Sequence, residues 1–292
     1  HSDWQATVKH CDIATAKFRE ECFGAEYEAS VALVFSLQAL GLAGDIKALN
    51  RRLPNAIRDA DERGDLFAAN NCRGGFHAIG RIATGQLALV QAELQKVVET
   101  WTPGFYQMHA YHRVFAGVNS DLYLGNPHEA MARIDDDWGE LKNGLFLTME
   151  LPALELRWTR ARACLAVAKV LPTKKAGKFI GRAKTINRLI RRSTVAAAQP
   201  HCDMINAGIA TLANDSLEAS AFLRSALSGY TNAGMSIHRE VARWLLLAYL
   251  QGEEYELMKT QSEAWQTENA LTEMHRLFDA LAPECRQNHL LG

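Results

Sequence analysis

The chain has 292 residues, of which 48% are hydrophobic and 22% are charged, and its formal net charge is −1. This composition excludes an intrinsically disordered chain, and the length suffices for one or two domains with sizeable cores. No stretch approaches the roughly 18 uninterrupted apolar residues of a membrane span, and the opening sequence HSDWQATVKH lacks the apolar core of a signal peptide. Abundant Ala, Leu, Glu and Arg, with only seven prolines, favour helices throughout.

A helix break recurs about every forty residues, where a helical tail meets Gly or Asn and a new amphipathic segment begins. These breaks lie at Gly44, Gly85, Gly125, Asn214 and Gly252. Their separations are 41, 40, 89 and 38 residues, and a weaker break at Pro172 divides the long interval because proline ends the preceding helix. Two helices per unit of this length are typical of stacked helical hairpins, so we expect a single all-α solenoid domain over residues 1–292.

In chain order, we expect an N-terminal helix over residues 3–22, then six hairpins, then a C-terminal helix near residues 270–281. The hairpins lie near residues 26–62, 65–101, 105–143, 146–195, 199–230 and 235–267. Since each break then lies inside a hairpin, helix 3–22 is an unpaired second helix. Its apolar side chains need a partner or form an improvised cap of the array; they are Trp4, Val8, Cys11 and Phe18.

The tripeptide Arg63-Gly64-Asp65 has two interpretations. On an exposed loop of a secreted protein it is an adhesion ligand. In a helical array, Gly64 ends one helix and the Asp65 carboxylate caps the next. Apolar side chains recur at helical spacing over residues 66–83, so we expect one helix there and favour the junction.

Six cysteines are scattered through the chain without a CxxC pair: Cys11, Cys22, Cys72, Cys164, Cys202 and Cys285. Isolated cysteines in a chain of this size are typical of buried thiols in a reducing compartment. We therefore expect a cytoplasmic protein without a disulfide framework.

Three segments resemble the C-terminal tetratricopeptide-like region of large bacterial serine/threonine protein kinases and related multidomain regulators. They are RGDLFAANNCRGG (63–75), YHRVFAGVNSDLYLGNPHEAM (111–131) and LFDALAPE (277–284). The resemblance covers almost the whole chain and implies a right-handed α–α superhelix that serves a kinase or ATPase as an accessory module. The units are longer than the usual thirty-four residues. The chain lacks the Gly-rich, HRD and DFG motifs of kinases and a GxxxxGK[ST] loop, so we expect no catalytic residues and no cofactor.

Polar residues share one face on several helices that begin a hairpin. They are Asn70, Arg73, His77 and Arg81 on the first, His109 and Arg113 on the next, and Glu155, Thr159 and Arg162 on a third. In tetratricopeptide arrays such helices line the concave surface, so the resemblance implies a groove that binds a protein segment or a small effector. The alternative is that these faces are only solvated.

Between Glu155 and Asp203 the chain has twelve basic residues and no acidic one. Eight form a candidate docking patch: Lys174, Lys175, Lys178, Arg182, Lys184, Arg188, Arg191 and Arg192. Such a patch fits an acidic partner, a phosphorylated segment or nucleic acid, or it pairs with Asp135-Asp136-Asp137 of the same chain. Phe179 is the lone aromatic residue of the patch, which argues against stacking on bases.

Metal ligation finds little support, because His109 and His112 lack a third ligand on their helix and the adjacent His201, Cys202 and Asp203 point in different directions.

Our leading hypothesis is a non-catalytic interaction or sensor module with a protein or peptide partner and no membrane partner. Two alternatives stay open. One is a nucleic-acid-binding regulator that uses residues 157–192, and the other is a hydrolytic enzyme that uses His77 or His109.

Overall fold

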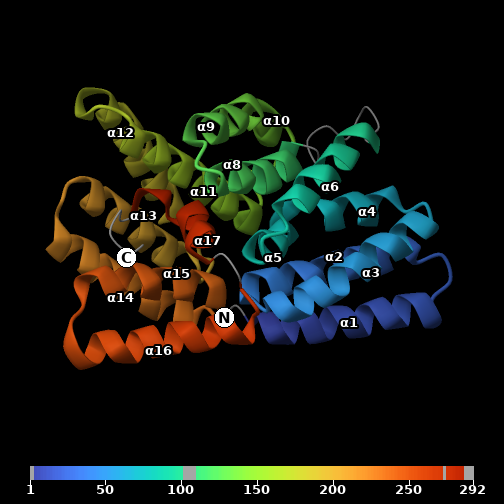
Figure 1. Cartoon of the computed structure of the whole chain (residues 1–292). Coiled ribbons are helices and arrows are strands. Elements are labelled where there is room, and N and C mark those ends of the chain that lie inside the picture. Colours follow the sequence, from blue (N-terminus) through green and yellow to red (C-terminus); the bar gives the residue numbers. More distant parts are fainter. Residues whose placement is uncertain (1–2, 101–109, 272–273, 286–292) are drawn as a thin grey trace.

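The structure, a computed structural model, describes residues 3–100, 110–271 and 274–285 (Figure 1). Within these ranges the chain forms helices joined by short turns, with no β-strand. The expectation of an all-α fold is therefore confirmed for the described residues. None of their helices has both the length and the apolar character that a bilayer crossing requires.

The helices fall into three consecutive groups. The first comprises α1 (Trp4–Glu20), α2 (Glu26–Ala43), α3 (Ile46–Glu62), α4 (Leu66–Arg73), the 3-10 helix η1 (Gly75–His77), α5 (Ala78–Ala83) and α6 (Leu87–Thr100). The second comprises the π-helical segment η2 (Arg113–Val118), α8 (Asn119–Tyr123), α9 (Pro127–Asp136), α10 (Trp138–Asn143), α11 (Glu150–Val170) and α12 (Thr173–Ile190). The third comprises α13 (Ala198–Leu212), α14 (Ser216–Asn232), α15 (Ser236–Leu246), η3 (Leu247–Tyr249), α16 (Gly252–Glu268), α17 (Met274–Leu281) and η4 (Pro283–Cys285).

All five predicted breaks adopt the left-handed backbone conformation. The φ angles of Gly44, Gly85, Gly125, Asn214 and Gly252 are 78°, 73°, 78°, 58° and 63°. Glycine takes this conformation without steric cost, and asparagine tolerates it better than most residues. The predicted breaks are therefore confirmed, as is the weaker one at Pro172, which lies between α11 and α12.

The junction at Gly64 and Asp65 is also confirmed. Gly64 has a φ of 67°, and Asp65 Oδ1 accepts a hydrogen bond from the backbone N–H of Ala68 at 2.9 Å. This carboxylate satisfies one of the free N–H groups of the first turn of α4. The tripeptide therefore has a local structural role.

The single helix expected over residues 66–83 is wrong. It is interrupted after α4 by extended Gly74 and left-handed Gly75. A Cβ atom on Gly74 would lie 2.5 Å from the side chain of His112, so the backbone approaches the residue that precedes η2 more closely than another residue type allows. A tertiary contact therefore interrupts a segment whose local spacing favours a continuous helix.

Consecutive helices pack against one another along most of the chain, and the row of helices curves so that α15 meets α2. In Figure 1, α1–α6 lie on the right, α8–α12 at the top, and α13–α16 on the left and below. Trp4 Nε1 donates to Ala233 O at 2.8 Å, and Ser236 Oγ donates to Ala43 O at 2.7 Å. These bonds close the arc of helices between its first and last groups.

The N-terminal helix does not lack a partner, because α1 packs along α2. None of its residues is fully buried. The helix therefore lies on the outside of the array, as a cap would.

Four of the six thiols are buried, those of Cys72, Cys164, Cys202 and Cys285, and all six cysteines are free. The expectation of buried thiols is wrong for Cys22, which is exposed, and for half-buried Cys11. Both belong to the outer α1 region, where no further helix covers them.

Helices α11 and α17 lie in the space that the other helices surround (Figure 1). Most of α11 is buried on all sides, from Ala153 to Ala168. The C-terminal helix predicted near residues 270–281 corresponds to α17, whose Leu277, Phe278 and Leu281 side chains are buried. A helix that is buried all round needs small and apolar residues on every face, and the alanine-rich sequence of α11 provides them.

Candidate binding site

The C-terminal segment, residues 274–285, occupies the central space. Its helix α17 packs against α5, α8 and α15, and its 3-10 turn η4 packs against α11 and α13. The Phe278 ring lies 5.6 Å from the ring of Trp244, centroid to centroid. The Arg276 guanidinium lies 5.8 Å from the centre of the Tyr123 ring. A short segment of this chain is thus gripped by helices from all three groups.

Two cations of α11 bind backbone carbonyl groups of the C-terminal segment. Arg162 Nη1 donates to Ala280 O at 2.6 Å, and Lys169 Nζ donates to Pro283 O at 3.2 Å. The last carbonyl groups of a helix have no partner inside it, and positive charge is favourable there. Arg162 and Lys169 therefore hold the end of α17 and the following turn through backbone carbonyl groups. These contacts do not depend on the side chains of the C-terminal segment.

The Arg162 side chain is buried and contacts several neighbouring side chains. Its Nη2 atom donates to Asn119 Oδ1 at 3.0 Å and to Thr159 Oγ1 at 3.1 Å, and its guanidinium lies 4.0 Å from the centre of the Trp158 ring. Burial lowers the pKa of Arg162 to about 10, partly offset by the charges of Glu155 and Glu284. The guanidinium still carries its charge at neutral pH.

Beside Arg162 lies a buried group of ring side chains. His201 is stacked on Trp158 with ring centroids 4.3 Å apart, its Nδ1 atom lies 2.6 Å from the Tyr230 hydroxyl, and its Nε2 atom lies 3.2 Å from Glu155 Oε1. His238 completes the group, 5.4 Å from His201. Burial lowers the pKa of His238 well below its usual range, and the nearby His201 and Arg162 lower it further. This network ties α11 to α13, α14 and α15.

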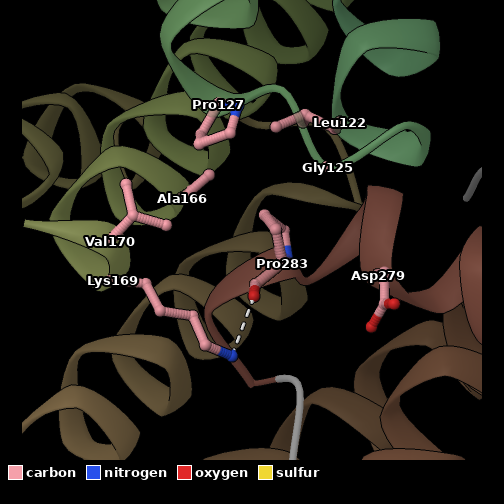
Figure 2. Close-up of a pocket in the computed structure, with 8 residues that line it drawn as sticks. All are labelled: Leu122, Gly125, Pro127, Ala166, Lys169, Val170, Asp279 and Pro283. Carbon is pink, nitrogen blue, oxygen red and sulfur yellow. Dashed lines mark hydrogen bonds between the residues drawn. The ribbon is translucent and has the colours of Figure 1, made fainter.

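A cleft runs beside the C-terminal segment (Figure 2). It has a volume of about 310 Å³ and lies between α17 with η4, α11 and the turn before α9. Its lining residues are Leu122, Gly125, Pro127, Ala166, Lys169, Val170, Asp279 and Pro283. Lys169 reaches across from α11 to the segment. The central space is therefore incompletely filled along this side.

The structure brings together the first four predicted groove residues, but it encloses them. Asn70, Arg73, His77 and Arg81 are all buried. Arg73 Nε donates to Glu93 Oε2 of α6 at 2.6 Å, so α6 covers the polar face that we expected to be open. We call this group the α4–α6 cluster.

His77 is turned toward the backbone in this cluster. Its Nδ1 atom lies 3.3 Å from Gly74 O and its Nε2 atom lies 3.4 Å from Val34 O. Burial lowers the pKa of His77, against the opposing effect of these two hydrogen bonds. The histidine is therefore enclosed by the fold, away from an open surface.

Of the remaining predicted groove residues, one is half-buried and three are buried on α11. Arg113 is half-buried, and its Nε atom lies 3.1 Å from Asp137 Oδ2. Glu155 and Thr159 are buried on α11 beside Arg162, which holds the C-terminal segment. His109 lies outside the described residues.

The basic docking patch lies on α12 and the turn after it. Seven of its side chains are exposed and form no ion pair with the described residues; they are Lys174, Lys175, Lys178, Lys184, Arg188, Arg191 and Arg192. Arg182 differs, because it is half-buried and its Nη2 atom lies 2.7 Å from Asp135 Oδ1, which Arg160 also contacts. The predicted pairing with Asp135-Asp136-Asp137 therefore occurs for one residue of the patch, Arg182.

Sequence reasoning missed Glu93 and the ring group around His201. Glu93 shares the buried face of α6 with Val90 and Val97, and a carboxylate on an apolar face signals a buried cationic partner. His201, Cys202 and Asp203 point in different directions, as predicted, since they bind Tyr230, Asn187 and Ser225 respectively. The role of His201 in the core depends on residues far apart in the sequence.

Comparisons with protein families, with curated proteins and with solved structures found no match.

Proposed function

We propose that this protein is a non-catalytic interaction module that binds a protein segment in its central space. The observation that carries the proposal is the C-terminal segment, which occupies that space and is held by Arg162 and Lys169 through its backbone carbonyl groups. A site that grips backbone and apolar side chains in this way accepts an amphipathic helix of another chain in the same place.

The arrangement we propose is a tetratricopeptide-like right-handed superhelix. Its support is the order of packing, in which consecutive helices lie against one another, and the left-handed breaks at the predicted spacing. In this arrangement the centre of the curve is the natural binding surface. The C-terminal segment then stands where a partner helix binds.

The ligand chemistry follows from the contacts of the C-terminal segment. Its anchors are apolar side chains at positions 277, 278 and 281, spaced so that they share one helix face. Its C-terminal carbonyl groups meet Arg162 and Lys169. We therefore propose a partner helix with apolar anchors at this spacing and a free C-terminal turn.

A kinase or ATPase domain is the partner or attached domain that we propose. This part rests on the resemblance of residues 63–75, 111–131 and 277–284 alone. Binding of a segment changes the behaviour of such a domain only if it binds more tightly to one of two states. Here the two states are the C-terminal segment docked and the C-terminal segment displaced.

The two alternative functions have different support. The seven exposed cations on α12 suit a polyanion, and nucleic-acid binding by residues 157–192 stays a prediction. Hydrolysis by His77 lacks support, because both of its ring nitrogens face backbone carbonyl groups inside the fold, and hydrolysis by His109 stays a prediction.

The test uses a labelled synthetic peptide of residues 274–285 and three proteins: the wild type, Phe278→Asp and Leu217→Asp. Phe278 is an anchor, whereas Leu217 is 83% exposed on α14 and serves as the matched control. We expect the peptide to bind Phe278→Asp at least tenfold more tightly than the wild type or Leu217→Asp. The substitution weakens docking of the variant protein's own C-terminal segment, so the central space is free for the peptide. Adding Lys169→Ala to Phe278→Asp should weaken this binding.

Equal binding to all three proteins, or none to a Phe278→Asp protein that keeps its helical circular dichroism, contradicts the proposal. Leu281→Ala, a milder change, replaces Phe278→Asp if that protein loses its helices. Unfolding of both variants would identify the segment as an irreplaceable part of the core and would also overturn the proposal.

A further inference from the structure

Arg81 in the α4–α6 cluster is a buried cation to which the described residues offer no hydrogen-bond or ion-pair partner. The side chain is only 5% exposed. Among the described residues, its guanidinium group takes part in no hydrogen bond and no ion pair. Every other buried arginine of the described chain, Arg73 and Arg162, donates to several acceptors. Arg81 is therefore exceptional in this fold.

The carboxylate whose charge acts on Arg81, that of Glu93, is already engaged. Glu93 binds Arg73 through Oε2 at 2.6 Å and Lys96 through Oε1 at 3.4 Å, and Asp61 also binds Arg73. Burial lowers the pKa of Arg81, Glu93 opposes this effect, and the positive charge of Arg73 reinforces it. Arg73 and Arg81 thus lie close enough to repel each other, and Arg73 forms the ion pairs with Glu93 and Asp61.

An uncompensated buried charge is costly, and arginine does not relieve that cost by releasing its proton at neutral pH. The cost disappears when an anion binds. The planar guanidinium group offers paired N–H donors that match the oxygens of a phosphate or a carboxylate. The remaining 5% of exposed surface shows that the side chain is not fully sealed.

The α4–α6 cluster contains a further unused donor. Asn70, one helical turn before Arg73, accepts from Thr100 Oγ1 through Oδ1 at 3.1 Å, and none of the hydrogen bonds among the described residues uses its amide nitrogen. From these observations we infer that Arg81 is the principal contact of a binding site for a small oxyanion, either free phosphate or the carboxylate of a small acid. This site is separate from the central space and does not depend on the proposed binding of a segment.

The experiment measures thermal unfolding of the wild type, Arg81→Met and Arg188→Met, each in phosphate, succinate and sodium chloride at equal ionic strength. Arg188 is exposed on α12, so Arg188→Met removes the same charge away from the site. Bound anion stabilises the folded state, and at concentrations far above Kd we expect phosphate or succinate to raise the Tm of the wild type and Arg188→Met by roughly 3 °C or more. Arg81→Met should show no such increase.

A second comparison separates this site from a structural role of Arg81. In sodium chloride alone, Arg81→Met should unfold at the same temperature as the wild type or higher, because it removes an unpaired buried charge. A large loss of Tm in sodium chloride would show that Arg81 has a partner within the fold, and the inference would fail.

The two anions distinguish the sources. A shift with phosphate alone assigns a phosphate site, a shift with succinate alone assigns a carboxylate site, and a shift with both assigns a general oxyanion site. Calorimetric titration with the effective anion should give one site per chain in the wild type and none in Arg81→Met. Absence of a shift with either anion, or an equal shift in Arg81→Met, would overturn the inference.

Discussion

At the scale of single residues, the C-terminal segment carries a buried acid. Glu284 is fully enclosed, with Gly208 of α13 so close that a Cβ atom there would overlap its carboxyl group. Burial raises the pKa of Glu284 to about 7, although its own backbone, Lys169 and Arg162 lower it. The proton on this carboxyl group is therefore coupled to the docking of the segment.

The coupling predicts a pH dependence of stability. An acid whose pKa is about 7 in the folded protein and near 4.5 in the unfolded chain stabilises the fold fully below pH 4.5. This contribution is lost as the pH rises through 7, and by pH 8 the loss of stability amounts to about 3 kcal/mol. We expect Glu284→Gln, which stays neutral, to remove this component of the urea unfolding curve between pH 4.5 and 8.

The exposed Glu256→Gln is the control for this experiment and should keep the pH dependence of the wild type. If Glu284→Gln and Glu256→Gln behave alike, the carboxyl group of Glu284 is not held neutral by the fold.

At the scale of elements, glycine has opposite effects at helix ends and inside helices. Gly64 ends a helix in the left-handed conformation with a φ of 67°, where a side chain is strained. Gly177 and Gly181 lie inside α12 on its exposed face, and a Cβ atom at either position meets nothing within 4 Å. Their lack of a side chain only weakens the helix.

Replacing the interior glycines should therefore stabilise the protein. We expect Gly177→Ala and Gly181→Ala each to raise the free energy of unfolding by about 0.5–1 kcal/mol. Gly64→Ala should lower it by about 1 kcal/mol because alanine resists the left-handed conformation. Urea unfolding of the three variants checks this, and a stability loss for both α12 variants would indicate that their glycines are needed for contacts in that helix.

At the scale of the whole molecule, the contact between the first and last groups of helices closes the arc. Gly44 lies at this contact, where a Cβ atom would come within 2.7 Å of the backbone nitrogen of Ile237. Gly125 has the same φ of 78° but open space around it. A side chain at either position would therefore be strained by the left-handed backbone, but only at Gly44 would it also clash with the last group of helices.

Comparison of Gly44→Ala with Gly125→Ala isolates the energy of closure. Both variants lose about 1 kcal/mol from the left-handed conformation, and we expect Gly44→Ala to lose about 1–3 kcal/mol more because alanine overpacks the contact. Small-angle scattering should show a larger radius of gyration for Gly44→Ala alone. Equal stability and equal size of the two variants would mean that the ends of the arc meet without mutual dependence.

The helical class and the helix ends follow from local chemistry and are readable from the sequence. Breaks such as Gly44 and Asn214 depend on the left-handed conformation, and the Asp65 cap depends on a carboxylate one turn from its N–H partner. These interactions span a few residues, so residue type and spacing are enough to predict them.

The tertiary structure alone decides which polar faces stay open. The sequence places Arg73, His77 and Arg81 on one helix face, but only the packing of α6 encloses them, and only the return of the chain end brings Ala280 to Arg162. Burial is a property of neighbours that are distant in sequence, and amphipathic spacing reports a polar face without reporting what covers it. For this reason the polar helix faces were predictable, whereas their enclosure and the segment that Arg162 holds were not.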